Sequence, residues 1–142
     1  MRILVPVDGS ASAGRAAALA LRLAGPGGDG EVVLLNVQNI STLDTSDVSS
    51  VMSVGADSRL AVERSQKALG AALELCRYAP VKHSTRTAFG PIAETIVRIA
   101  DEMAADQIVM GTRNFGPLRG AVLGSVSTKV LHAARMPVTL VK

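Results

Sequence analysis

Short apolar runs that alternate with helix-forming segments restrict the fold of this chain more than any other feature of its sequence. The runs are rich in Val, Ile and Leu, and Gly, Pro and Asp residues mark several of the boundaries between segments. Strands of this kind that alternate with helices are typical of a parallel sheet covered by helices on both faces. The apolar runs predict strands at residues 2–7, 32–37, 107–110 and 137–141, and alternation predicts a further strand, third in chain order, at residues 81–88.

Helix-forming segments fill the intervals between these runs. Ser10 is a favourable N-cap for an Ala- and Leu-rich segment that Gly25 ends, and Pro91 occupies the first turn of a later helix. A polar stretch, residues 38–53, is rich in Ser, Thr and Asp and is the least structured part of the sequence. The predicted helices are residues 11–24, 54–77, 92–103 and 125–134.

A chain of 142 residues is expected to form one domain, residues 1–142. The predicted fold class is α/β, with an open five-stranded parallel sheet in the strand order 3-2-1-4-5 and helices on both faces. Such sheets bind ligands outside the carboxyl ends of the strands, where the winding of the chain reverses. In this order the reversal lies between the first and fourth strands, which end at Asp8 and Gly111, so we expect a crevice there.

Composition and charge exclude nucleic-acid binding. Only 2% of the residues are aromatic, so the chain lacks the stacking platform of single-strand nucleic-acid binders. The net charge of +3 is small and the Lys and Arg residues are dispersed, which argues against duplex binding. We therefore expect no nucleic-acid partner.

Cysteine and histidine usage argues against disulfides and metal sites. Cys76 is the only cysteine, and His83 and His132 are far apart with no partner at metal-ligand spacing. No apolar run approaches the roughly 18 residues of a membrane span. The apolar N-terminus ends at Asp8 and no signal-peptide cleavage site follows it. We expect a cytoplasmic protein without membrane contact.

A glycine-rich segment, residues 111–124, leads from the fourth predicted strand into the last helix at Ser125. The N–H groups and partial positive charge of a helix start suit an anion such as phosphate, and glycines allow its close approach. Ser125 and Ser127 add hydroxyl donors. In the alternative interpretation, Ser125 is an ordinary N-cap and the glycines only turn the chain.

The segment resembles the signature of the universal stress protein family, G-x2-G-x9-G-[S/T], which here begins at Gly111 and ends with Gly124 and Ser125. The resemblance covers nearly the whole chain, because other pieces occur in the order and at the spacing of the family. These pieces read ILVPVDGS at residues 3–10, GP at 90–91, ADQIVMGTR at 105–113 and PVTLV at 137–141.

The resemblance implies a Rossmann-like fold of the adenine nucleotide alpha hydrolase-like type. It also implies binding of ATP, or of the related nucleotides AMP or ADP, because many members of the family bind ATP. It places the adenine end of the ligand against Val7, Asp8 and the backbone near Val37. The residues that it places against the ribose and phosphates are Gly111, Asn114, Gly124, Ser125, Val126 and Ser127.

Two of these positions leave alternatives open. Asn114 replaces the second glycine of the signature, and its side chain either crowds a phosphate or hydrogen-bonds to it. Asp8 either contacts the nucleotide, directly or through Mg²⁺, or forms an Asx-type turn at the strand end. One carboxylate is a thin basis for phosphoryl transfer, and no P-loop lysine follows the glycines.

From the resemblance we predict a protein that binds ATP and acts as a sensor or regulator in a stress response. Two alternatives stay open: a dimeric interaction module without nucleotide, and a weak ATPase or phosphotransferase. We also expect a homodimer, because the strand Pro137 to Val141 would present apolar side chains at a sheet edge. No tryptophan or tyrosine is placed to sandwich a base, so the affinity should depend more on the phosphates than on the base.

Overall fold

The computed structural model describes residues 1–25, 28–39, 53–112 and 123–142. These residues form a five-stranded sheet in the order β3-β2-β1-β4-β5, and every neighbouring pair of strands is parallel. The predicted fold class and strand order are confirmed. The strands are β1 (Arg2–Pro6), β2 (Glu31–Gln38), β3 (Lys82–Phe89), β4 (Gln107–Gly111) and β5 (Val138–Val141). The helices are α1 (Ala11–Ala24), α2 (Ser53–Cys76), α3 (Ile92–Glu102) and α4 (Ser125–Ala133).

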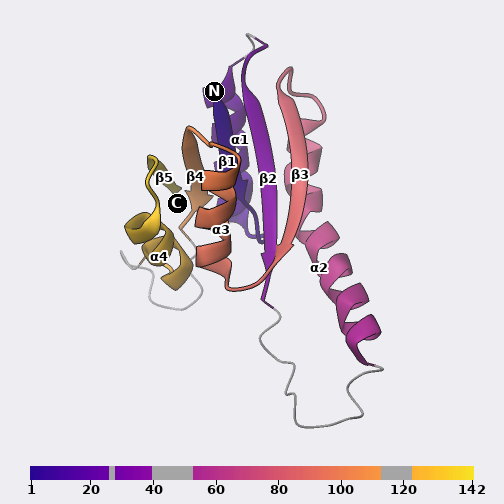
Figure 1. The fold of residues 1–142 in the computed structure, drawn as a ribbon. Helices are drawn as coiled ribbons and strands as arrows, with labels where there is room; N and C mark the ends of the chain where they lie inside the picture. The colour runs from indigo at the N-terminus through magenta and orange to yellow at the C-terminus, as the bar shows by residue number, and fades with distance from the viewer. Residues whose placement is uncertain (26–27, 40–52, 113–122) are drawn as a thin grey trace.

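The helices cover the sheet in two layers, with α3 and α4 on the near face in Figure 1 and α1 and α2 on the far face. The side chains of alternate residues of β1 pack on opposite faces of the sheet. Ile3 and Val5 belong to the apolar cluster with α1 and α2, and Leu4 belongs to the cluster with α3 and α4. A strand that is buried on both sides needs apolar residues at successive positions, which explains the continuous apolar run.

The edge strand β3 departs from the expectation of a sheet covered on both faces. The side chains of residues 82–87 are exposed, and all of them are polar or charged. α2 reaches this strand through a hydrogen bond of 2.7 Å between the Ser65 and Thr87 hydroxyl groups. The apolar layers therefore stop short of this edge, where polar side chains also hinder pairing with another chain.

The helix ends follow the capping residues in the sequence with one difference. The Ala13 N–H donates to Ser10 Oγ at 3.2 Å, and Gly25 ends α1 with a φ of 70°, as predicted. Pro91, in contrast, is the N-cap of α3 and not part of its first turn. Its ψ of 124° keeps it outside the helix, and its carbonyl accepts the Thr95 N–H at 2.9 Å.

β2 continues to Gln38, which is the first residue of the stretch expected to be least structured. Its pairing with Phe89 extends the ladder between β2 and β3 to that point. Ser53, the last residue of that stretch, also departs from the expectation because it begins α2. Residues 40–52 lie outside the described residues, as do residues 113–122 of the glycine-rich segment. Within the described part of the chain, no helix is long and apolar enough to cross a membrane.

Candidate functional site

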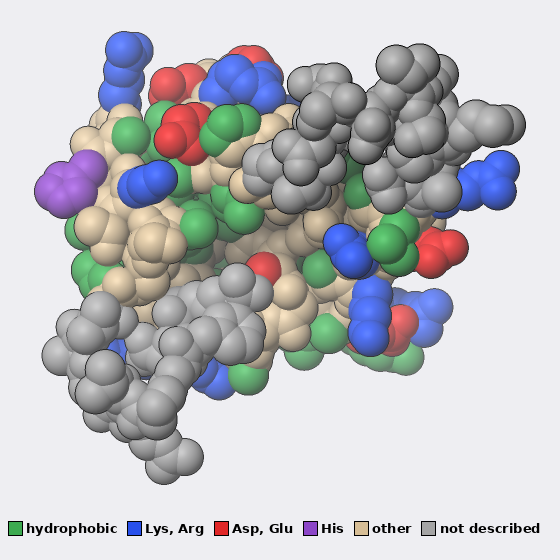
Figure 2. All heavy atoms as spheres, turned by 90° about the horizontal axis from the view of Figure 1, so that it is seen from below, with side chains coloured by type: hydrophobic (Ala, Val, Ile, Leu, Met, Phe, Trp, Pro, Cys, Tyr) green, Lys and Arg blue, Asp and Glu red, His purple; other side chains and the backbone are tan. Residues whose placement is uncertain are grey.

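A cavity opens at the carboxyl edge of the sheet, among the ends of β1 and β4 and the starts of α1, α3 and α4. Figure 2 looks onto this edge, where backbone and hydrophobic side chains occupy the centre and most Lys and Arg side chains lie toward the periphery. The described residues enclose about 90 Å³. The position is the predicted one, where the winding of the sheet reverses. The lining residues are Pro6, Val7, Asp8, Ser10, Ala13, Leu35, Val37, Ile92, Ile96, Met110, Gly111, Val126 and Ser127.

The structure brings together several residues that the resemblance to the family implies. The ones that line the cavity are Val7, Asp8, Val37, Gly111, Val126 and Ser127. Gly124 and Ser125 directly precede the lining residue Val126 at the start of α4 but do not line the cavity themselves. Asn114 lies outside the described residues.

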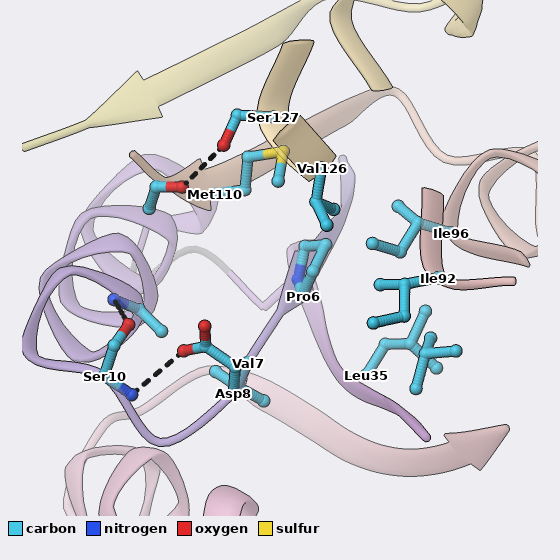
Figure 3. A pocket seen from close by; sticks show the side chains of 13 residues that line it. Pro6, Val7, Asp8, Ser10, Leu35, Ile92, Ile96, Met110, Val126 and Ser127 are labelled. Carbon is cyan, nitrogen blue, oxygen red and sulfur yellow. Dashed lines mark hydrogen bonds between the residues drawn. The ribbon is translucent and has the colours of Figure 1, made fainter. Parts of the chain in front are cut away.

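One end of the cavity is aliphatic, with Leu35 from β2 opposite Ile92 and Ile96 from the first turns of α3 (Figure 3). The spacing of the isoleucines predicts a helix. Because this helix begins just after a strand, its first turns lie at the carboxyl edge of the sheet, where ligands bind. This position is the signal in the sequence that could have identified both isoleucines. The lining residues that were not predicted are Pro6, Ser10, Ala13, Leu35, Ile92, Ile96 and Met110.

The opposite end of the cavity carries the polar turn that begins α1. One carboxylate oxygen of Asp8 accepts the Ser10 N–H at 2.9 Å, which is the Asx-type turn expected as one alternative. Ser10 Oγ in turn accepts the Ala13 N–H (Figure 3). It also lies 3.2 Å from Ser12 Oγ. The start of α1 is therefore stabilised by the side chains of the turn that directly precedes it.

Gly111 allows the end of β4 to approach the start of α1 closely. A Cβ atom at this position would lie 2.5 Å from Ser12 Oγ, 2.8 Å from the Ser12 carbonyl carbon and 2.9 Å from the Ala13 nitrogen. These distances are too short for any side chain, and two of the atoms belong to the backbone. Glycine is required here by the packing of two elements that border the cavity.

The Ser127 hydroxyl joins α4 to the same point. It donates to the Gly111 carbonyl oxygen at 3.2 Å, and the residue is only 1% exposed. The hydroxyl that sequence analysis assigned to an anion is thus engaged by the protein in this structure. Ser127 positions the first turn of α4 against the end of β4 (Figure 3).

Among the residues that the structure describes, no side chain caps the start of α4. Gly124 is the N-cap residue, so the alternative interpretation with Ser125 as N-cap is wrong. The first backbone bond of the helix runs from the Thr128 N–H to the Gly124 carbonyl at 3.0 Å. The N–H groups of Ser125, Val126 and Ser127 therefore have no partner within the helix. Of these three residues, Ser125 is exposed.

The ends of β1 and β2 are joined by a buried amide. The Val7 N–H donates to the Leu35 carbonyl at 2.8 Å. The Val7 carbonyl accepts a hydrogen bond from Asn36 Nδ2 at 2.7 Å. Val37 follows directly and lines the cavity.

Metal-binding and reactive side chains are scarce around these elements. Among the described residues, no three His, Cys, Asp or Glu side chains are grouped so that they could hold a metal ion. Of the described residues that line the cavity, Asp8 is the only acidic one. Burial raises the pKa of the Cys76 thiol, which suits the expected packing role rather than a nucleophilic one.

Comparisons with known proteins agree with the resemblance in the sequence. The model of the universal stress protein family matches residues 1–142. Universal stress protein MJ0531 of Methanocaldococcus jannaschii is 33% identical over 147 aligned positions, which cover 99% of this chain and 81% of that protein.

Solved structures share the fold over almost the whole chain. The hypothetical protein MJ0577 is 27% identical, with a TM-score of 0.81 and coverage of 99% of this chain and 94% of that one. A universal stress protein from Archaeoglobus fulgidus, solved in complex with dAMP, is 23% identical with a TM-score of 0.64, and the match covers 100% of this chain and 98% of that one. By the match of the family model and the identity to MJ0531, the chain belongs to the universal stress protein family.

Proposed function

We propose that the cavity at the carboxyl edge binds ATP or a related adenine nucleotide, and that the protein acts as a sensor or regulator in a stress response. The observation that carries this proposal is the pairing of an aliphatic cavity with an uncapped helix start at its border. The first suits a base and the second suits a phosphate. The nucleotide complex of the related Archaeoglobus fulgidus protein, which has the same fold, supports the same ligand class.

The base would lie in the aliphatic end, against Val7, Leu35 and Ile92. The backbone N–H and C=O of Val37 would face its edge, because alternate residues of β2 direct these groups toward β1 and β1 has already ended. Adenine presents a donor and an acceptor side by side, which matches one N–H and one C=O. None of the described lining residues is aromatic, and these residues would hold the base by aliphatic contact and backbone bonds.

The phosphates would lie at the start of α4. The N–H groups of Ser125, Val126 and Ser127 and the positive end of the helix dipole suit an anion. The exposed Ser125 hydroxyl would add a donor, while Ser127 would contribute its backbone N–H because its hydroxyl is bonded to Gly111. Gly124 would allow the phosphates to approach the backbone closely.

Asp8 and Gly111 would also contact the nucleotide, since both line the cavity. Mg²⁺ would be held by the phosphates, with Asp8 in indirect contact through water, because a single carboxylate does not form a metal site. When bound, the ion would neutralise phosphate charge. Residues 1–142 would act as one cytoplasmic domain.

We further propose a homodimer formed through β5. This strand ends the sheet opposite β3, and its side chains are half-buried and mostly apolar, including Val138 and Leu140. An apolar edge strand favours pairing with a second copy, whereas the polar edge at β3 does not. Light scattering should give a dimeric mass, and a strictly monomeric mass at micromolar concentration would contradict the proposal.

Isothermal titration with ATP, with and without Mg²⁺, tests the nucleotide proposal. We expect saturable heat that AMP and ADP compete for, with affinity rising with the number of phosphates. No heat and no competition up to millimolar concentrations would contradict it and would favour the interaction module without nucleotide. Mass spectrometry of gently purified protein provides a second test, because bound nucleotide should copurify.

A further inference from the structure

One buried amide determines what the end of β2 offers to a ligand. The Asn36 residue is 2% exposed, and its Nδ2 donates to the Val7 carbonyl oxygen at 2.7 Å. Its Oδ1 accepts from Gln38 Nε2 at 2.6 Å. Both ends of the Asn36 amide are therefore engaged, so its orientation is determined by its two neighbours.

The ladder between β1 and β2 shows which backbone groups this amide replaces. The Glu31 N–H donates to the Met1 carbonyl and the Leu35 carbonyl accepts the Val7 N–H, so these β2 residues direct their backbone groups toward β1. Gln38 directs its carbonyl the other way, to the Gly90 N–H. By this alternation Val37 is the next residue that faces β1, and its natural acceptor would be the Val7 carbonyl.

We propose that Asn36 is a positioning residue for base recognition, and this rests on the proposed function of the cavity. By bonding to the Val7 carbonyl, Asn36 ends the ladder between β1 and β2 at the level of Leu35. The N–H and C=O of Val37 are thereby left to face the cavity. The Val7 carbonyl can only accept a hydrogen bond, so it holds the amide nitrogen of Asn36 toward β1, and Gln38 donates to the oxygen at the other end of the amide.

The role of Asn36 predicts a particular loss of selectivity. ITP differs from ATP at the base edge, where an oxo group replaces the amine and the ring nitrogen carries a proton. With ITP, the Val37 N–H would face the ring N–H, which is also a donor, and the Val37 carbonyl would face the oxo group, which is also an acceptor. When Asn36 is changed to Ala, the Val37 N–H can bond to the Val7 carbonyl, and the preference for ATP should disappear. A general loosening of the fold would instead weaken both nucleotides equally.

Amide hydrogen exchange measured by NMR on the unliganded full-length protein tests the backbone part of the inference. In the wild type, the Val37 N–H should exchange about 100-fold faster than the Leu35 N–H, because it lacks a ladder partner. Asn36→Ala should slow exchange at Val37. Gln38→Ala is the matched control, because it retains the bond from Asn36 to Val7, and it should leave Val37 fast. Equal protection of Val37 and Leu35 in the wild type would overturn the inference even if Asn36→Ala does not fold.

Titration of the wild type and of Asn36→Ala with ATP and ITP tests the part that concerns the base. The wild type should prefer ATP by about tenfold, as one well-formed hydrogen bond allows, and Asn36→Ala should bind both nucleotides equally. A wild type that binds ATP and ITP with equal affinity would overturn the inference and leave the proposed function standing. A wild type that binds neither would contradict the proposed function, and the exchange rate of Val37 would still decide whether Asn36 ends the ladder.

Discussion

Three helices begin at the same cavity, and two of them, α1 and α4, begin in opposite ways. α1 starts with a cap in which Ser10 accepts the Ala13 N–H and Asp8 accepts the Ser10 N–H. α4 starts after Gly124, and no side chain of the described residues caps it. Both sit at the carboxyl edge of one sheet, so the fold alone does not distinguish them.

The difference indicates which helix forms a wall and which receives a ligand. The N–H groups at the start of α1 are partly satisfied by its own side chains, so this helix can support the cavity without a ligand. The start of α4 leaves partial positive charge and N–H donors at the border of the cavity, and an anion would satisfy them. Substitutions that remove the cap of α1, or that add a cap to α4, therefore test the proposed site.

The largest expected effect comes from Gly111, which holds both helix starts in place. Gly111→Ala would place Cβ 2.8 Å from the Ser12 carbonyl carbon, so α1 must move away from β4. We expect the free energy of unfolding to fall by about 3 kcal/mol, measured by urea denaturation. ATP binding should be lost with it, because Ser127 also bonds to the Gly111 carbonyl.

Gly14 provides the matched control for this prediction. It lies within α1, and a Cβ atom there would meet nothing within 4 Å. Gly14→Ala should raise the free energy of unfolding by about 0.5–1 kcal/mol, because alanine favours the helix. If Gly111→Ala were as stable as the wild type, the close approach of β4 and α1 would not limit this position.

Giving α4 the kind of cap that α1 has is the next test. Gly124 has φ −60° and ψ 153°, which any residue can adopt, so Gly124→Asp should cap the helix and raise the melting temperature of the unliganded protein. The same carboxylate would occupy the proposed phosphate position and repel the ligand. ATP affinity, measured by titration, should fall by at least about tenfold, or roughly 1.4 kcal/mol.

Gly124→Asn separates the two effects of the aspartate. It can cap the helix without adding charge, so stability should rise a little and affinity should fall less than with aspartate. Unchanged ATP affinity in Gly124→Asp would move the phosphates away from α4.

The contrast also shows what could be predicted from the sequence. The strand order and the meeting of Asp8 with Gly111 follow from apolar runs and helix signals along the chain, and both agree with the structure. The roles of the serines do not follow in this way. Ser10 and Ser127 are both serines in the first turn or cap of a helix, yet one accepts from its own helix and the other donates to Gly111. The second role depends on packing between elements far apart in the sequence, which periodicity does not encode.

Removing the cap of α1 should have a moderate effect on stability. Ser10→Ala leaves the Ala13 N–H without its acceptor, and we expect the free energy of unfolding to fall by about 1 kcal/mol. Ser10→Thr retains a capping hydroxyl and should recover most of the loss. Thermal melts of both variants measure the effect. Equal melting temperatures for Ser10→Ala and the wild type would show that the cap does not stabilise α1.

The smallest expected effects separate the two serines in the first turn of α4. Ser127 is buried and its hydroxyl donates to Gly111, so Ser127→Ala should lower the free energy of unfolding by about 1 kcal/mol. Ser125 is exposed, so Ser125→Ala should leave stability unchanged and weaken ATP binding about threefold. Urea denaturation and titration on both variants give the two readouts. A stability loss in Ser125→Ala with none in Ser127→Ala would reverse the assignment, and the Ser127 hydroxyl would then be the better candidate for contact with phosphate.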